Sequence, residues 1–140
     1  MRIMSIDLGK KRTGIAISDI NESLASPFCV ISQGNVERLI DEISKIIKEH
    51  KVKEIVVGLP KNMDGSEGDS AKNAREFADK LQKLTMLNVI LRDERNTTVS
   101  AHGYLNVTDV RGKKRKSIVD SVAATIILQD YLDYRRNNNG

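Results

Sequence analysis

The sequence predicts an α/β fold, in which a five-stranded mixed sheet carries helices on both faces. Near the amino end, three short segments rich in β-branched residues follow one another and are separated only by "GKKR" and "DINE". This pattern is typical of antiparallel strands joined by turns. Further along, apolar segments of strand length alternate with segments of helical period, as in parallel strands joined by helices.

The three antiparallel strands are expected at residues 2–7, 13–18 and 24–32. Proline cannot donate a hydrogen bond to a neighbouring strand, so Pro27 predicts that the third strand lies at an edge of the sheet. Cys29 lies in the same strand and is expected to be an ordinary apolar side chain.

Helices and strands then alternate. A stripe of leucine and isoleucine follows Asn35, which is expected to cap the first helix, and this helix ends near His50. The continuous apolar segment "EIVVGLP" at 54–60 is typical of a parallel strand buried on both faces. The later elements are expected to be a helix after the loop at 61–69, a strand at 88–92, a short helix near 99–105, and a last helix from about Ser117 to about Tyr134.

A chain of 140 residues has the size of one domain. We expect a single domain at 1–136 and a disordered tail at 137–140, where the sequence is "NNNG". No segment approaches the run of about 18 apolar residues that a membrane span requires. The protein is therefore expected to be cytoplasmic, without a membrane partner.

The net charge of +4 comes entirely from the last 30 residues. Residues 1–110 hold 16 Lys and Arg against 16 Asp and Glu, whereas residues 111–140 hold 7 against 3. The centre of this excess is "RGKKRK" at 111–116, within a segment, 107–116, that we expect to be a mobile loop. Such a segment attracts a polyanion such as nucleic acid, although a solvated surface loop has the same composition.

Carboxylates follow two of the predicted strands. Asp7 ends the first strand, and Asp93 and Glu94 end the last. Because ligands of open α/β sheets bind outside the carboxyl ends of the strands, these groups are expected at one rim. Asp120 lies among apolar residues that surround most of the last helix, and a buried carboxylate needs a partner. One divalent cation or a pair, Mg²⁺ or Mn²⁺, would satisfy all of them.

Each carboxylate also has a purely structural interpretation. Asp7 could cap a turn, and Asp120 could be an exposed residue in the first turn of a helix. The adjacent acids at 93–94 could pair with Arg92 and Arg95. Three such groups at one rim favour the metal site.

These residues fall in four motifs that together resemble the YqgF/RuvX family, whose members are described as Holliday junction resolvases and as pre-16S rRNA nucleases. The motifs are "DLGKKRTGIAISD" at 7–19, "VVGLPKNMDGSEG" at 56–68, "DERNTT" at 93–98 and "DSVAATIILQDYLD" at 120–133. The resemblance implies a ribonuclease H-like fold, with Asp7, Glu94 and Asp120 as catalytic, metal-binding residues and Asp93 as a further candidate ligand. Asn96 departs from the leucine expected there, which affects local packing rather than chemistry.

The resemblance implies a hydrolase that cleaves phosphodiester bonds of structured nucleic acid with two metal ions, so His50 and His102 receive no role. We expect 5′-end processing of precursor 16S ribosomal RNA during ribosome biogenesis. The alternative is branched DNA in recombination, which needs two active sites and therefore a homodimer. Two other classes are an actin-like ATPase, which needs a second domain, and a non-catalytic nucleic-acid-binding module, which leaves Asp120 unexplained.

Contacts to the substrate are expected from the basic cluster after Asp7, the loop after the fourth predicted strand and the basic segment. In the first of these, Gly9 and Gly14 permit close backbone approach. In the loop, Asp64 could position the substrate, although "NMDG" also reads as a simple turn. The expected nucleic-acid-binding residues are Lys10, Lys11, Arg12, Asn62, Arg95, Arg111, Lys113, Lys114, Arg115 and Lys116.

Overall fold

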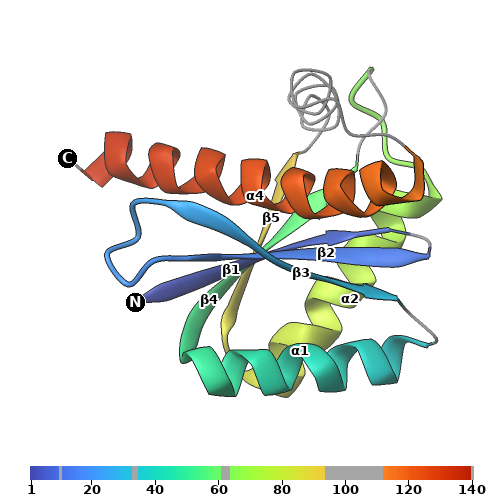
Figure 1. Ribbon diagram of the computed structural model, residues 1–140, viewed down its shortest axis with the longest axis horizontal. Helices are drawn as coiled ribbons and strands as arrows, with labels where there is room; N and C mark the ends of the chain where they lie inside the picture. Colours follow the sequence, from blue (N-terminus) through green and yellow to red (C-terminus); the bar gives the residue numbers. More distant parts are fainter. Residues whose placement is uncertain (10, 33–34, 61–63, 94–111, 140) are drawn as a thin grey trace.

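A five-stranded sheet lies between helices on its two faces (Figure 1). The computed structural model describes residues 1–9, 11–32, 35–60, 64–93 and 112–139, and the side chains of the last range from 122 to 136. The elements are β1 (Arg2–Leu8), β2 (Arg12–Ser18), β3 (Ala25–Ser32), α1 (Val36–His50), β4 (Val52–Leu59), α2 (Asp69–Thr85), β5 (Asn88–Asp93) and α4 (Gly112–Asn139). Helix α4 covers one face, and α1 and α2 cover the other (Figure 1).

The strand order confirms the predicted mixed sheet. It is β3-β2-β1-β4-β5, with β2 antiparallel to both β1 and β3, and β4 parallel to both β1 and β5. Strand β1 is central, so the carboxyl ends of β1, β4 and β5 lie at the same end of the sheet. The short helix expected near 99–105 lies outside the described residues.

Strand β3 is an edge strand, as Pro27 predicts. Ile15 pairs with Cys29 and Ala16 pairs with Pro27, so Phe28 is an extra residue on β3. This bulge lets a proline lie in the sheet, because the ladder is interrupted there. Cys29 is half-buried against the core, and burial raises the pKa of its thiol, which disfavours the reactive thiolate.

Side chains along β1 alternate between two apolar cores. Met4 and Ile6 are buried in the core beneath α1 and α2, whereas Ile3 is buried in the core beneath α4. Odd-numbered positions of β1 therefore face α4. The Ser5 hydroxyl confirms this direction, because it donates to the carbonyl oxygen of Ala124 in α4 at 2.5 Å.

Helix α1 begins as predicted. The Asn35 side chain accepts a hydrogen bond from the Arg38 amide at 2.8 Å, which satisfies one of the amides left free at a helix start. The helix ends at His50, and Lys51 follows it in the left-handed conformation, with φ of 54°.

Helix α4 is longer than predicted at both ends. It begins at Gly112 rather than near Ser117, so residues 112–116 are helical and their assignment to a mobile loop was wrong. Lysine and arginine are good helix formers, and clustered like charges at one end do not outweigh that preference. The helix ends at Asn139 rather than near Tyr134, so its backbone includes residues 137–139 of the expected tail.

Burial along α4 is also narrower than expected. Within its described side chains, the buried residues form one stripe that faces the sheet, at Ala123, Ala124, Ile127, Leu128, Tyr131 and Leu132. The neighbouring Ile126 is only half-buried. No helix in the described ranges combines the length and apolar character needed to cross a membrane.

A polar network fixes the carboxyl-terminal half of α4 to the amino end of the sheet. The Arg135 guanidinium lies 2.6 Å from the Glu22 carboxylate and 3.4 Å from the Glu54 carboxylate. Glu54 is buried at the start of β4, and the arginine neutralises its charge there. This end of α4 therefore lies far along the sheet from Asp7.

We expect Tyr131→Phe to reduce the loss of stability at alkaline pH. Burial, together with the Glu54 carboxylate, raises the pKa of Tyr131 from its ordinary 10.0 to about 12. The unfolded chain then loses this proton first, so the free energy of unfolding falls as pH rises through that interval. Urea unfolding at pH values below and above this interval should show a smaller fall in the free energy of unfolding for the variant than for the wild type. Equal falls would contradict the prediction.

Candidate metal centre and nucleic-acid interface

Asp7 lies near the carboxyl end of the central strand. It is half-buried, and its odd position in β1 places it on the same face as Ser5, beneath α4. Its partner across the β1–β2 ladder is Gly14. Gly14 itself contributes no side chain beside the Asp7 carboxylate on that face.

The register of α4 on β1 brings Asp120 toward Asp7. Ser5 bonds to Ala124, while Ile3 packs in the same core as Leu128, so α4 runs antiparallel to β1 (Figure 1). From the Ser5–Ala124 contact, Asp7 lies two strand residues onward, about 6.8 Å along β1. Asp120 lies four helical residues back, about 6 Å along α4 in the same direction.

These nearly equal displacements keep the two backbones side by side. The Asp120 backbone is described within α4, and its side chain is not. The register therefore places the two backbones together, and the pairing of the two carboxylates stays a prediction.

The side chains of β5 alternate between the two faces of the sheet. Ile90 packs toward α4, whereas Val89 and Leu91 pack toward α1 and α2. Asp93, which is exposed, has the parity of the second group and lies on the face away from Asp7. Glu94 lies outside the described residues.

The side chains of two of the expected metal ligands are thus not among those that the structure describes. Among the residues that the structure describes, no three carboxylate, thiol or imidazole groups form a metal-binding cluster. Asp7 and Asp93 are the two expected ligands whose side chains are described, and they lie on opposite faces of the sheet. Glu94 and Asp120 remain predicted ligands.

The β1–β2 turn needs a glycine for its own geometry. The Gly9 amide donates to the Arg12 carbonyl at 3.0 Å, and a Cβ on Gly9 would lie 2.3 Å from that carbonyl oxygen. The close approach at Gly9 is therefore to its own turn. Arg12 is half-buried and shares the α4 face with Gly14, whereas Lys11 is exposed and Lys10 lies outside the described residues.

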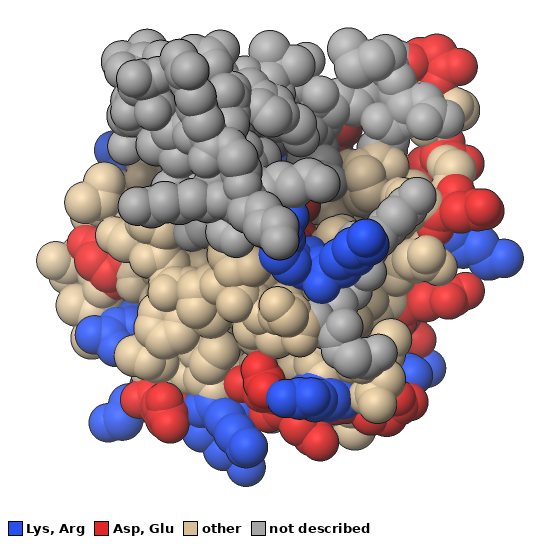
Figure 2. Space-filling view, turned by 45° about the vertical axis from the view of Figure 1, so that its right-hand side comes forward, with Lys and Arg blue, Asp and Glu red and all other residues tan. Residues whose placement is uncertain are grey.

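The surface at this end of the molecule is basic in part. Figure 2 brings forward the side where β1 passes into β2, and Lys and Arg side chains gather near the centre of that view. Basic and acidic side chains are mixed along the lower part of the same view. Lys113 to Lys116 lie in the first turns of α4, which begins at this end of the sheet (Figure 1).

The loop after β4 was also expected to contact the substrate, and its described residues form a local turn. The Asp64 carboxylate accepts hydrogen bonds from the Ser66 amide at 2.9 Å and the Ser66 hydroxyl at 2.6 Å, as in a simple turn. Asn62, Arg95 and Arg111 lie outside the described residues.

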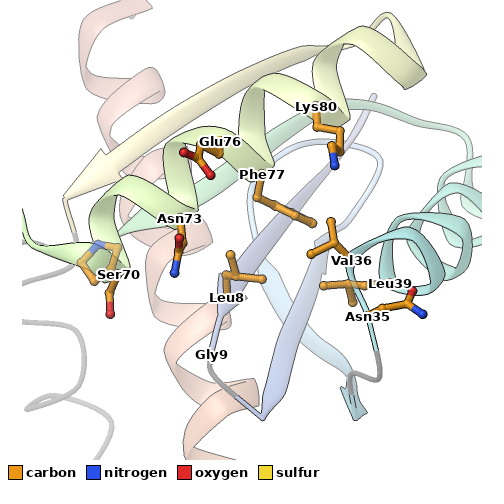
Figure 3. Close-up of a pocket in the computed structure, with 11 residues that line it drawn as sticks. Leu8, Gly9, Asn35, Val36, Leu39, Ser70, Asn73, Glu76, Phe77 and Lys80 are labelled. Carbon is orange, nitrogen blue, oxygen red and sulfur yellow. The ribbon is translucent and has the colours of Figure 1, made fainter.

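A pocket of about 630 Å³ lies on the opposite face of the sheet, between α1, α2 and the end of β1 (Figure 3). Leu8, Leu39 and Phe77 contribute apolar surface, and Asn35 and Asn73 contribute amides. Leu8 follows Asp7 but points to the other face, so this pocket is separate from the Asp7 side of the sheet.

Comparison with known proteins assigns the family. The profile of the RuvX family, "Holliday junction resolvase", matches residues 1–134. The chain belongs to the RuvX family. Two relatives, from Halothermothrix orenii and Clostridium botulinum, carry the provisional name "pre-16S rRNA nuclease". The first is 46% identical over 140 residues, which is all of both chains, and the second is 46% identical over 133 residues, 95% of this chain and 97% of the relative.

Solved structures support the fold of this RuvX-family chain. "T. thermophilus RuvC in complex with Holliday junction substrate" matches with a TM-score of 0.62 at 12% identity, over 98% of this chain and 96% of that one. A fowlpox virus resolvase bound to Holliday junction DNA matches with a TM-score of 0.57 at 14% identity, over 96% and 98%. At these identities the likeness shows the shared fold, which is the predicted ribonuclease H-like one.

Sequence reasoning missed Ser5. This residue is fully buried and joins the central strand to α4, two residues before Asp7. The sequence feature that could have indicated it is a serine within an apolar strand, two residues before Asp7 and therefore on the same face of the strand.

Proposed function

We propose that this RuvX-family protein is a divalent-metal-dependent nuclease that hydrolyses phosphodiester bonds of structured nucleic acid in the cytoplasm. The observation that carries the proposal is the register that sets the Asp120 backbone beside Asp7, at the carboxyl end of the central strand. Two negative charges brought together at a partly solvent-accessible rim need a counter-ion. Residues 1–136 would act as one nuclease domain.

The donor set fits a hard divalent cation. Asp7, Glu94 and Asp120 would hold Mg²⁺ or Mn²⁺, which prefer oxygen ligands. Asp93 is a weaker candidate because it lies on the face of the sheet away from Asp7. A bound pair of such ions supplies an activated water for attack on the phosphate and stabilises the leaving oxygen. Gly14 adds no side chain beside Asp7, and Arg12, on the same face, can hold a phosphate of the substrate.

The amino-terminal end of α4 suits a polyanion. Its first turn contains no acidic residue, and lysines and arginine occupy positions 113–116. The positive end of the helix dipole disfavours these cations unless negative charge is nearby. Phosphates of a nucleic acid would supply that charge.

Replacing Lys113, Lys114, Arg115 and Lys116 with serine should weaken binding of structured RNA and flatten its dependence on salt. Each lost phosphate contact should reduce the slope of log K against log salt by about 0.9. Fluorescence anisotropy over a salt series measures this slope. Affinity for metal ions should be unchanged.

The matched control removes four exposed lysines from α1 and α2, at positions 45, 48, 72 and 83. It changes the net charge equally but lies on the other face of the sheet. If both variants flatten the slope equally, the effect is one of overall charge, and the phosphate contacts would move to Lys10, Lys11 and Arg12.

We infer that precursor 16S ribosomal RNA is the substrate, since relatives that match over nearly their whole length are named as pre-16S rRNA nucleases. Branched DNA is the second candidate, because the family profile is that of a Holliday junction resolvase. Purified protein should cleave labelled 5′-extended precursor RNA faster than a labelled four-way junction, in Mg²⁺ and in Mn²⁺. Faster, paired cuts in the junction would reverse this choice and imply a homodimer.

A further inference from the structure

We propose that Ser5 is a positioning residue that sets the register of α4 on β1, and so the separation of the Asp7 and Asp120 backbones. The proposal rests on the proposed metal-dependent function and extends it to a residue outside the metal site. Ser5 is 0% exposed, so it cannot touch substrate. It acts through its hydrogen bond to α4.

The hydrogen bond joins the two elements that carry the carboxylates. The Ser5 hydroxyl donates at 2.5 Å to the carbonyl oxygen of Ala124, which is itself 0% exposed. Ser5 precedes Asp7 by two residues on the same face of β1, and Ala124 follows Asp120 by one helical turn. Any slip of α4 along β1 at this contact changes the Asp7–Asp120 separation directly.

Polar contacts also hold α4 farther along, at Gln129 and at Arg135, but the apolar contacts beside Ala124 add no direction of their own. Beneath α4 the sheet presents Ile3, Ala16 and Val56, and α4 presents Ala124 and Leu128 in the same apolar core. Apolar contact is non-directional, so it does not by itself select one axial position of the helix. A hydrogen bond to one carbonyl is directional, so it selects one axial position of the helix.

The size of Ser5 also matters. Ser5, Ala16 and Ala124 are small and buried where α4 crosses the central strands, which lets the helix backbone lie close to the sheet. A metal site tolerates only small displacements of its ligands, of about 0.5 Å. A residue that holds the helix at this distance and register therefore controls metal affinity.

The test compares Ser5→Ala with Ser18→Ala. Ser18 is a matched control because it is also a buried strand serine, 3% exposed. Its oxygen accepts from the Ile3 amide at 2.9 Å, and its hydroxyl donates to the Asp19 carbonyl at 3.0 Å. It lies toward the amino end of β1, away from Asp7, so its loss should lower stability without moving a carboxylate.

Mn²⁺ affinity by calorimetry and the melting temperature in EDTA are measured for wild type and both variants. We expect Ser5→Ala to weaken Mn²⁺ binding about tenfold, the lower end of the effect of residues that orient metal ligands. Ser18→Ala should lower the melting temperature at least as much while leaving Mn²⁺ affinity unchanged.

Two outcomes overturn the proposal separately from the proposed function. Wild-type affinity in Ser5→Ala, or equal weakening in both variants, would show that Ser5 contributes only to general stability. Absence of Mn²⁺ binding by the wild type would instead refute the metal site itself, and the role of Ser5 with it.

Discussion

Replacing Asp7 or Asp120 with asparagine is expected to lower the rate of phosphodiester cleavage about a thousandfold without unfolding the protein. Loss of a metal ligand removes several kcal/mol of transition-state stabilisation, and about 4 kcal/mol corresponds to three orders of magnitude. In metal-free buffer each variant should be as stable as wild type or slightly more stable. The reason is that each substitution removes one of the like charges of the proposed metal site.

Single-turnover cleavage and urea unfolding in EDTA measure the two effects. Asp79→Asn is the control, because Asp79 lies on the outer face of α2 and pairs there with Lys83 at 2.9 Å. It should retain wild-type activity. Either site variant with full activity, or with an unfolded chain in EDTA, would contradict the assignment.

The second large effect separates the adjacent acids at the end of β5. Glu94→Gln should abolish most activity, whereas Asp93→Asn should change it little. The parity of β5 gives the reason, since Ile90 packs beneath α4 and Leu91 packs on the other face. Steady-state cleavage by both variants decides the matter, and a larger loss in Asp93→Asn would place the ligand one residue earlier.

The strands and their order could be predicted because the patterns that specify them are local. Short β-branched segments with turns between them indicated β1, β2 and β3, and the apolar run at 54–60 indicated a central parallel strand. Pro27 alone identified the edge, and the bulge that accommodates it follows from the same missing amide. Asn35 marked the start of α1 through its capping side chain.

The extent of α4 could not be predicted from the same kind of signal. Lysine and arginine at 113–116 have no apolar period, and asparagines at 137–139 are typical of tails, yet both segments are helical. A helix that is held by a buried stripe in its middle can extend beyond that stripe at little cost. The apolar period of the sequence therefore marks the packed middle of this helix but not its ends.

The candidate site was predicted as residue types but not as geometry. Asp7 was recognisable because a carboxylate ends an apolar strand, and the family resemblance added Glu94 and Asp120. The resemblance also ranked Glu94 above Asp93, and the packing of Ile90 and Leu91 places Asp93 on the face away from Asp7. The contact between Ser5 and Ala124 joins residues 119 positions apart, and no local pattern predicts it.

The most direct measurement is cleavage of labelled 5′-extended precursor 16S RNA as a function of Mg²⁺ and Mn²⁺ concentration, by wild type and by Asp120→Asn. The predicted result is no cleavage in EDTA, a rate that rises and saturates as either metal is added to the wild type, and no rise for Asp120→Asn. Cleavage that persists in EDTA, or a variant that follows the wild-type curve, would contradict a carboxylate metal centre formed by β1 and α4.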